Sequence, residues 1–135
     1  MMTREEALIR SIIGPSGGDV CPLAHAVRIM IRLLFSEHMS QDDVQMRTHI
    51  YPEVARLTGK TESAVSRQIE RVENLCWEHL DAVGQRTYIG KQLRDIRAPR
   101  DIMIYLAYYS HFNIPYYEVL KNHPEILFAG DVIQK

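Results

Sequence analysis

Apolar residues recur along this chain at helical spacings of three and four positions, and no strand-like alternation persists. The pattern is clearest from Tyr51 to Leu80, where Val65, Ile69, Val72 and Cys76 form one stripe. We therefore expect an all-α fold in which a long helix of this stretch buries one side.

A shorter helix is expected just before the long one. Pro52 suits the first turn of a helix, because the N–H that it lacks would be unpaired there. Gly59 can adopt the left-handed conformation that ends a helix, and Thr61 is a favourable N-cap for the next one. Residues 51–80 thus have the spacing of a helix-turn-helix, in which the small Ala55 lets the helices cross closely. An ordinary pair of antiparallel helices shows the same features, so a purely structural role stays open.

Further helices are expected on both sides of this unit. The N-terminal one begins with a capping box of Thr3 and Glu6 and ends at Gly14. The other predicted helices span residues 23–39 and 101–112, with shorter ones after Ser40 and over 116–121. Gly84 is interpreted as the stop signal of the long helix.

Composition is that of one globular domain. The chain has 135 residues, a formal net charge of −1 and 46% hydrophobic residues, and it has no apolar run of the ~20 residues that a membrane span requires. The N-terminus does not have the layout of a signal peptide, so we expect a cytoplasmic protein. Cys21 and Cys76 lack metal-site spacing and are expected to be free thiols.

The helix-turn-helix residues resemble the C-terminal DNA-binding effector domain of the sporulation-initiation response regulators. The resemblance is centred on Tyr51-Pro52, Ala55, Thr61, Ser63, Val65, Arg67, Ile69 and Trp77. In weaker form it covers about residues 4 to 112, so the chain is divided into an effector-like domain, 1–112, and a helical tail, 113–135, outside the match. The resemblance implies about six helices, a recognition helix that starts near Thr61 and enters the major groove, and a dimer on tandem sites.

The chain departs from that family in three respects. Where the family has an Arg-x-Glu-Arg pattern, this sequence has Ala64, Val65, Ser66 and Arg67, so one charged reader remains. No receiver domain is expected, and hence no control by phosphorylation. The segment after Trp77 is dissimilar, which leaves a contact with RNA polymerase unsupported.

Candidate DNA contacts fall into two groups. Those of the recognition helix are Thr61, Ser63, Ala64, Ser66, Arg67 and Arg71. Arginine reads guanine bidentately and serine contacts bases or phosphate, although Glu62, Glu70 and Glu73 on the same helix favour an ordinary solvated face. The second group, expected to bind phosphate, lies in the basic segment 85–100 and consists of Arg86, Lys91, Arg94 and Arg97. A solvated loop is an equally good interpretation of that segment.

Enzymatic and metal sites are not indicated. The six histidines show no pair four residues apart, and Gly17-Gly18 lacks the Lys-Ser/Thr of a phosphate-binding loop. No catalytic residue, metal or cofactor is therefore expected. An aromatic group is compatible with a ligand site, base stacking, core packing or a subunit interface: Tyr105, Tyr108, Tyr109, Phe112, Tyr116 and Tyr117.

The sequence thus predicts a stand-alone transcription regulator that binds double-stranded DNA. A homodimer is expected, with its interface on the final helix and the tail, because their apolar surface exceeds what one small domain hides. The alternative is a protein-interaction module, or an antagonist of full-length relatives, that kept the fold and lost DNA recognition.

Overall fold

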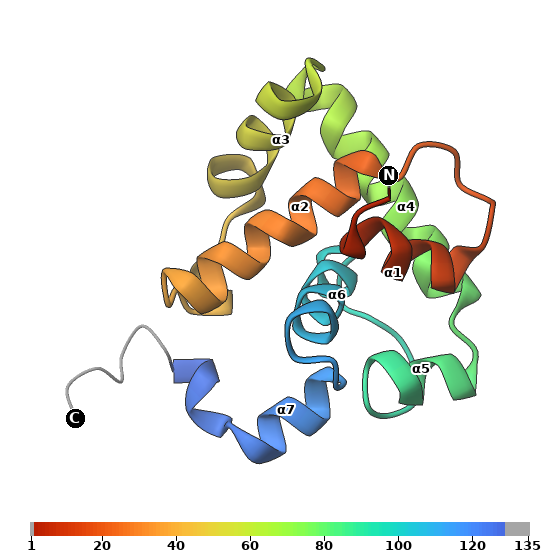
Figure 1. Cartoon of the computed structure of the whole chain (residues 1–135), viewed down its shortest axis with the longest axis vertical. Coiled ribbons are helices and arrows are strands. Elements are labelled where there is room, and N and C mark those ends of the chain that lie inside the picture. The colour runs from red at the N-terminus through yellow and green to blue at the C-terminus, as the bar shows by residue number, and fades with distance from the viewer. Residues whose placement is uncertain (1, 129–135) are drawn as a thin grey trace.

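The computed structural model describes residues 2–128, and every regular element in that range is a helix (Figure 1). The α-helices are α1 (Arg4–Ile13), α2 (Cys21–Ile31), α3 (Tyr51–Thr58), α4 (Glu62–His79), α5 (Ala82–Tyr88), α6 (Arg100–Phe112) and α7 (Tyr116–Asn122). Short π-helical segments are η1 (Arg32–Ser36) and η3 (Met46–Ile50), and 3₁₀ segments are η2 (Gln41–Asp43) and η4 (Pro124–Phe128). The predicted all-α, single-domain fold is confirmed.

Helix α6 is the central element. It contacts α1, α2, α4, α5 and α7, and Figure 1 shows it surrounded by the other helices. Its Met103 and Ala107 side chains are fully buried, and so are Leu23 and Met30 of α2. Helices α1, α2, α4, α5 and α7 therefore pack against α6, whereas α3 packs mainly against η3, α4 and α2.

The apolar stripe of α6 is covered by the chain itself. Ile102 and Leu106 are only 1% and 3% exposed, and the ring of Tyr108 packs edge-on against Tyr116 of α7 with centroids 4.8 Å apart. The chain itself thus covers this stripe, with α7 packed against α6 at Tyr108, and the homodimer stays a prediction. The part of the predicted interface beyond residue 128, and the side chains of 127 and 128, lie outside the described residues.

Most helix ends follow the predicted local signals. The capping box is present, with Glu6 N–H donating to Thr3 Oγ1 at 3.1 Å and Thr3 N–H donating to Glu6 Oε1 at 2.8 Å. Asn113 ends α6 in the left-handed conformation, with φ of 64°. The predicted helix over 23–39 is shorter, since α2 ends at Ile31 and continues only as η1.

Gly84 does not stop the long helix, contrary to the prediction. Helix α4 ends at His79, and the carboxylate of Asp81 then caps a new helix, α5, by accepting a hydrogen bond of 2.8 Å from the N–H of Gly84. An aspartate at an N-cap position starts a helix even where a glycine follows, because it satisfies an otherwise unpaired N–H.

Among the described residues, no helix is long and apolar enough to cross a bilayer.

Candidate nucleic-acid interface

The turn between α3 and α4 consists of residues 59–61. Gly59 adopts the left-handed conformation, with φ of 69° and ψ of 23°, and its N–H donates to the carbonyl oxygen of Ala55 at 2.9 Å. The N–H of Lys60 donates to the same oxygen at 3.2 Å. A residue with a Cβ is disfavoured in this conformation, so glycine is what allows so short a turn.

Thr61 starts α4 as predicted. Its Oγ1 accepts a hydrogen bond of 3.1 Å from the N–H of Ala64, and its backbone is extended, as an N-cap requires. Val65 and Ile69 are fully buried, and so is Val54 on α3, the helix that α4 contacts here. The buried stripe fixes which side of α4 faces outward.

That outward side is a stripe of exposed residues on α4: Ser63, Arg67, Glu70 and Asn74. Their spacing of four, three and four places them on one face. Within residues 2–128, Arg67 has no hydrogen-bond or ion-pair partner, in contrast to Gln68 and Arg71. Ala64 and Ser66, also predicted as contacts, are partly buried beside this stripe. The structure thus presents Ser63 and Arg67 together on the first two turns of α4.

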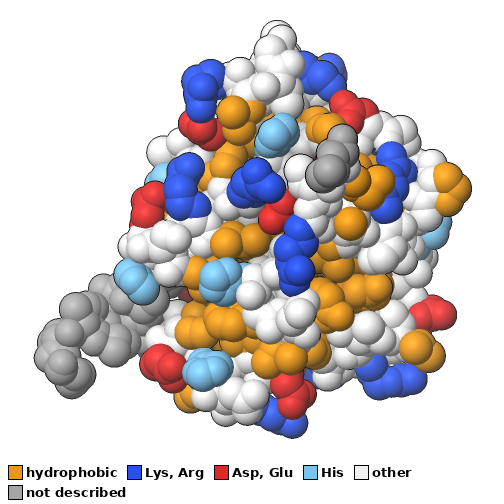
Figure 2. Space-filling view, in the orientation of Figure 1, with side chains coloured by type: hydrophobic (Ala, Val, Ile, Leu, Met, Phe, Trp, Pro, Cys, Tyr) orange, Lys and Arg blue, Asp and Glu red, His pale blue; other side chains and the backbone are white. Residues whose placement is uncertain are grey.

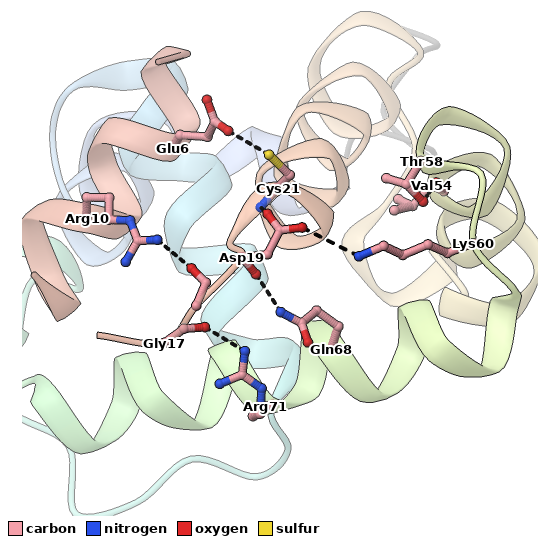
Figure 3. A network of polar contacts seen from close by, with 11 residues as sticks. Glu6, Arg10, Gly17, Asp19, Cys21, Val54, Thr58, Lys60, Gln68 and Arg71 are labelled. Carbon is pink, nitrogen blue, oxygen red and sulfur yellow. Dashed lines mark hydrogen bonds and ion pairs between the residues drawn. The ribbon is translucent and has the colours of Figure 1, made fainter. Parts of the chain in front are cut away.

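Arg71 lies beside this stripe, but its guanidinium is engaged elsewhere. It donates to the carbonyl oxygen of Gly17, in the loop between α1 and α2, and Gln68 donates to the carbonyl oxygen of Asp19 in the same loop (Figure 3). Lys60 Nζ lies 3.5 Å from Asp19 Oδ2. Arg71, predicted as a DNA contact, therefore has the loop between α1 and α2 as its partner.

Two basic residues at the turn were not among the predicted contacts. Arg56, which pairs with Glu53, and Lys60 are both exposed on either side of Gly59. Their positions in the sequence, within three residues of Gly59, were the signal from which these two contacts could have been predicted. Figure 2 shows basic and acidic side chains interspersed on the viewed face, with apolar side chains gathered over its lower half. On the viewed face, therefore, neither sign of charge is in strong excess.

The part of the second predicted group that lies on α5 (Ala82–Tyr88) is away from the turn. Helix α4 has 18 residues and is therefore about 27 Å long, and in Figure 1 helix α5 lies at the end of α4 opposite to α3. All four residues of this group are exposed, namely Arg86, Lys91, Arg94 and Arg97, and Lys91 Nζ lies 4.3 Å from the centroid of the Tyr117 ring. Arg86, on α5, therefore lies apart from Ser63 and Arg67.

Glu73 was counted among the acids that favour an ordinary solvated face, and this is wrong. Its side chain is buried, with the residue only 1% exposed, and Oε2 has no hydrogen-bond partner among the described residues. Burial, with smaller contributions from Glu70 and Asp101 and against the effect of Arg100, raises the pKa of Glu73 to about 8. The carboxyl group is therefore mostly neutral at pH 7.

Comparisons of this chain with protein-family models, with curated proteins and with solved structures found no match. Within residues 2–128, no group of three His, Cys, Asp or Glu side chains is placed to hold a metal ion. What the α3–α4 unit can bind therefore has to be inferred from its geometry and charge.

Proposed function

We propose that this protein binds double-stranded DNA by inserting the N-terminal half of α4 into the major groove. The observation that carries the proposal is the exposure of Ser63 and Arg67 on the first two turns of a helix that a three-residue glycine turn joins to α3. A helix presented in this way is the reading element of helix-turn-helix proteins.

The chemistry of this face suits a duplex. Arg67 has an unpaired guanidinium within the described residues, and arginine donates two parallel hydrogen bonds to guanine in the major groove. The hydroxyls of Thr61 and Ser63 can bond phosphate or base edges beside it. Lys60 and Arg56 flank the turn and supply positive charge for the phosphate backbone.

We place this DNA binding in transcription regulation, of the sporulation-initiation effector type that the residues around Thr61 and Arg67 resemble. Binding to tandem sites as a homodimer belongs to the same proposal. Its interface would have to use surface other than the buried side of α6, where Ile102 and Leu106 are covered.

A protein-interaction module that has lost DNA recognition is the second candidate. It is favoured by one observation: Glu70 lies on the same exposed stripe as Arg67, and Glu62 is exposed in the first turn of α4. Carboxylates at these positions repel phosphate, and they suit a basic protein surface instead.

A mobility-shift titration on a pool of random-sequence duplexes separates the two candidates. DNA binding predicts a complex at about 50 mM salt that weakens sharply at about 200 mM, because counterions are released from the duplex. Selection of bound duplexes should then enrich one sequence. No complex at the lower salt with about 100 μM protein would favour the interaction module, since even non-specific binding is tighter than that.

A further inference from the structure

A cavity of about 540 Å³ opens between η2, the start of α6 and the start of α7. Its volume lies within the range of roughly 300–1,000 Å³ that small-molecule sites occupy. The side chains that matter for its chemistry are Gln41, Arg97, Arg100, Tyr105, Tyr116 and Tyr117. It is separate from the exposed stripe of α4.

Hydrogen bonds of Gln41 link the elements that line this cavity. Gln41 Nε2 donates to the hydroxyl of Tyr116 at 3.0 Å, and the hydroxyl of Tyr108 donates to Gln41 Oε1 at 3.3 Å. The carbonyl oxygen of Gln41 accepts a hydrogen bond of 3.0 Å from Arg100 Nη2. These bonds connect η2, α6 and α7 around the opening of the cavity. A ligand therefore has to order few side chains when it binds, which lowers the entropy cost of binding.

The apolar part of the lining is aromatic. The rings of Tyr105 and Tyr116 are 5.2 Å apart between centroids, and those of Tyr116 and Tyr117 are 5.0 Å apart, both edge-on. Burial raises the pKa of the phenol groups of Tyr105 and Tyr116, so they stay protonated and can donate hydrogen bonds. Rings in this arrangement offer faces and edges to a flat ligand.

The charged part of the lining lies at the N-terminus of α6. Arg100 is in the first helical turn and uses Nη2 on Gln41, while Arg97 precedes the helix with a side chain that is 89% exposed. The carboxylate of Asp101 pairs with Arg97, because its Oδ2 accepts from the Arg97 N–H at 3.0 Å and lies 3.9 Å from Arg97 Nε. Asp42 is the other acid of the lining and is exposed. Guanidinium groups beside a helix N-terminus attract an anionic group, which the helix dipole also favours.

We propose that this cavity binds a small molecule in which a planar ring carries a phosphate or a carboxylate. The ring packs against Tyr105 and Tyr117, and the anionic group pairs with Arg97 and Arg100. A nucleoside monophosphate and an aromatic carboxylic acid share this chemistry, and both fit the volume range of such a cavity. The site needs no DNA, so it stands whether or not the chain binds a duplex.

Titrations followed by NMR of the isotope-labelled full chain test the site. The probes are adenosine monophosphate and indole-3-acetate, each paired with its uncharged counterpart, adenosine or indole. At least one anion is expected to shift the resonances of Ile104, Tyr105 and Tyr117, and to bind at least about tenfold more tightly than its counterpart. The probe that binds identifies whether the anionic group is a phosphate or a carboxylate.

A pair of matched variants locates the anion. Arg97→Gln should weaken binding about tenfold, because a charge-assisted hydrogen bond is lost. Arg94→Gln changes another exposed arginine of the same segment, one that does not line the cavity, and should leave binding unchanged. Absence of shifts with both anions at millimolar concentration, equal binding of anion and neutral counterpart, or equal effects of the two variants would each overturn the proposal.

Discussion

Arg71 of α4 donates a hydrogen bond to the carbonyl oxygen of Gly17, a residue 54 positions earlier in the chain. The loop sits tightly there, since a Cβ added to Gly17 would lie 2.9 Å from Ile13 Cδ1 and 3.2 Å from Leu75 Cδ1. From the other side, Arg10 donates to the carbonyl oxygen of Gly14 at 3.1 Å. The hydrogen bond from Arg71 thus connects the loop between α1 and α2 to α4, the proposed reading helix. This contact helps to fix the position of α4.

Arg71→Ala is expected to lower the free energy of unfolding by about 0.5–1.5 kcal/mol, the usual net value of one intramolecular hydrogen bond. Urea unfolding followed by circular dichroism measures this. The matched control is Arg67→Ala, which removes an arginine one turn earlier without a partner in the described residues and should change stability by less than about 0.5 kcal/mol. Equal losses in the two variants would show that the bond to Gly17 contributes nothing.

Arg67→Ala is expected to weaken DNA binding by roughly 1–3 kcal/mol, the cost of losing one bidentate guanine contact. Its preference among sites should relax at one base pair, because that contact is the one that reads sequence. Mobility shifts on the selected duplex and on variants of it measure both effects. A mutant with unchanged affinity and unchanged site preference would contradict the assignment of Arg67.

The elements that the sequence predicted well depend on residues close together in the chain. Thr3 with Glu6, Gly59 with Ala55, and Thr61 satisfy backbone groups within four positions, so their effect is visible locally. The buried stripe of α4 was predictable for the same reason. The prediction that Gly84 ends the long helix was wrong, because the N-cap from Asp81 starts a new helix in spite of the glycine.

The contacts of α4 with its neighbouring loop and the contacts that line the cavity were less predictable, because they link segments that are distant in sequence. Nothing near Arg71 in sequence indicates Gly17 as its partner, and the Gln41 contacts with Tyr116 and Arg100 span at least 59 positions. Burial of Glu73 is a different case. It follows Ile69 by four residues and precedes Cys76 by three, so the periodicity already placed it on the buried side. The usual preference of a charged residue for the surface gave the opposite and incorrect expectation.

Neutralising Arg86 and Arg94 together tests the sequence-based prediction of phosphate contacts in segment 85–100. If both touch phosphate, the slope of log affinity against log salt should fall by about 0.9 for each arginine that no longer binds a phosphate. Lys121→Gln, an exposed cation on α7, is the matched control. A slope that stays the same while binding persists would mean that the duplex contacts the turn region and does not reach α5.

Glu73 should make stability depend on pH in a direction opposite to that of most carboxylates. Its pKa is raised to about 8 in the folded protein from an ordinary value of 4.5, so between these values the folded state binds a proton that the unfolded state has lost. The free energy of unfolding contributed by this group is therefore fully present below pH 4.5 and is lost as the pH rises through 8. Charged or ionisable groups around it are Glu70, Arg100, Asp101, Tyr51 and Cys76.

Glu73→Gln is the decisive variant, because an amide keeps the shape of the protonated carboxyl and cannot ionise. Wild-type protein should lose stability between pH 5 and pH 8 with a slope of up to about 1.4 kcal/mol per pH unit, and the variant should lack that slope. Glu70→Gln changes an exposed carboxylate of the same helix and should retain most of it. Urea unfolding at pH 5, 6, 7 and 8 measures the three proteins. A wild-type slope that persists in Glu73→Gln would show that another group is responsible, and that Glu73 is charged in the folded protein at neutral pH.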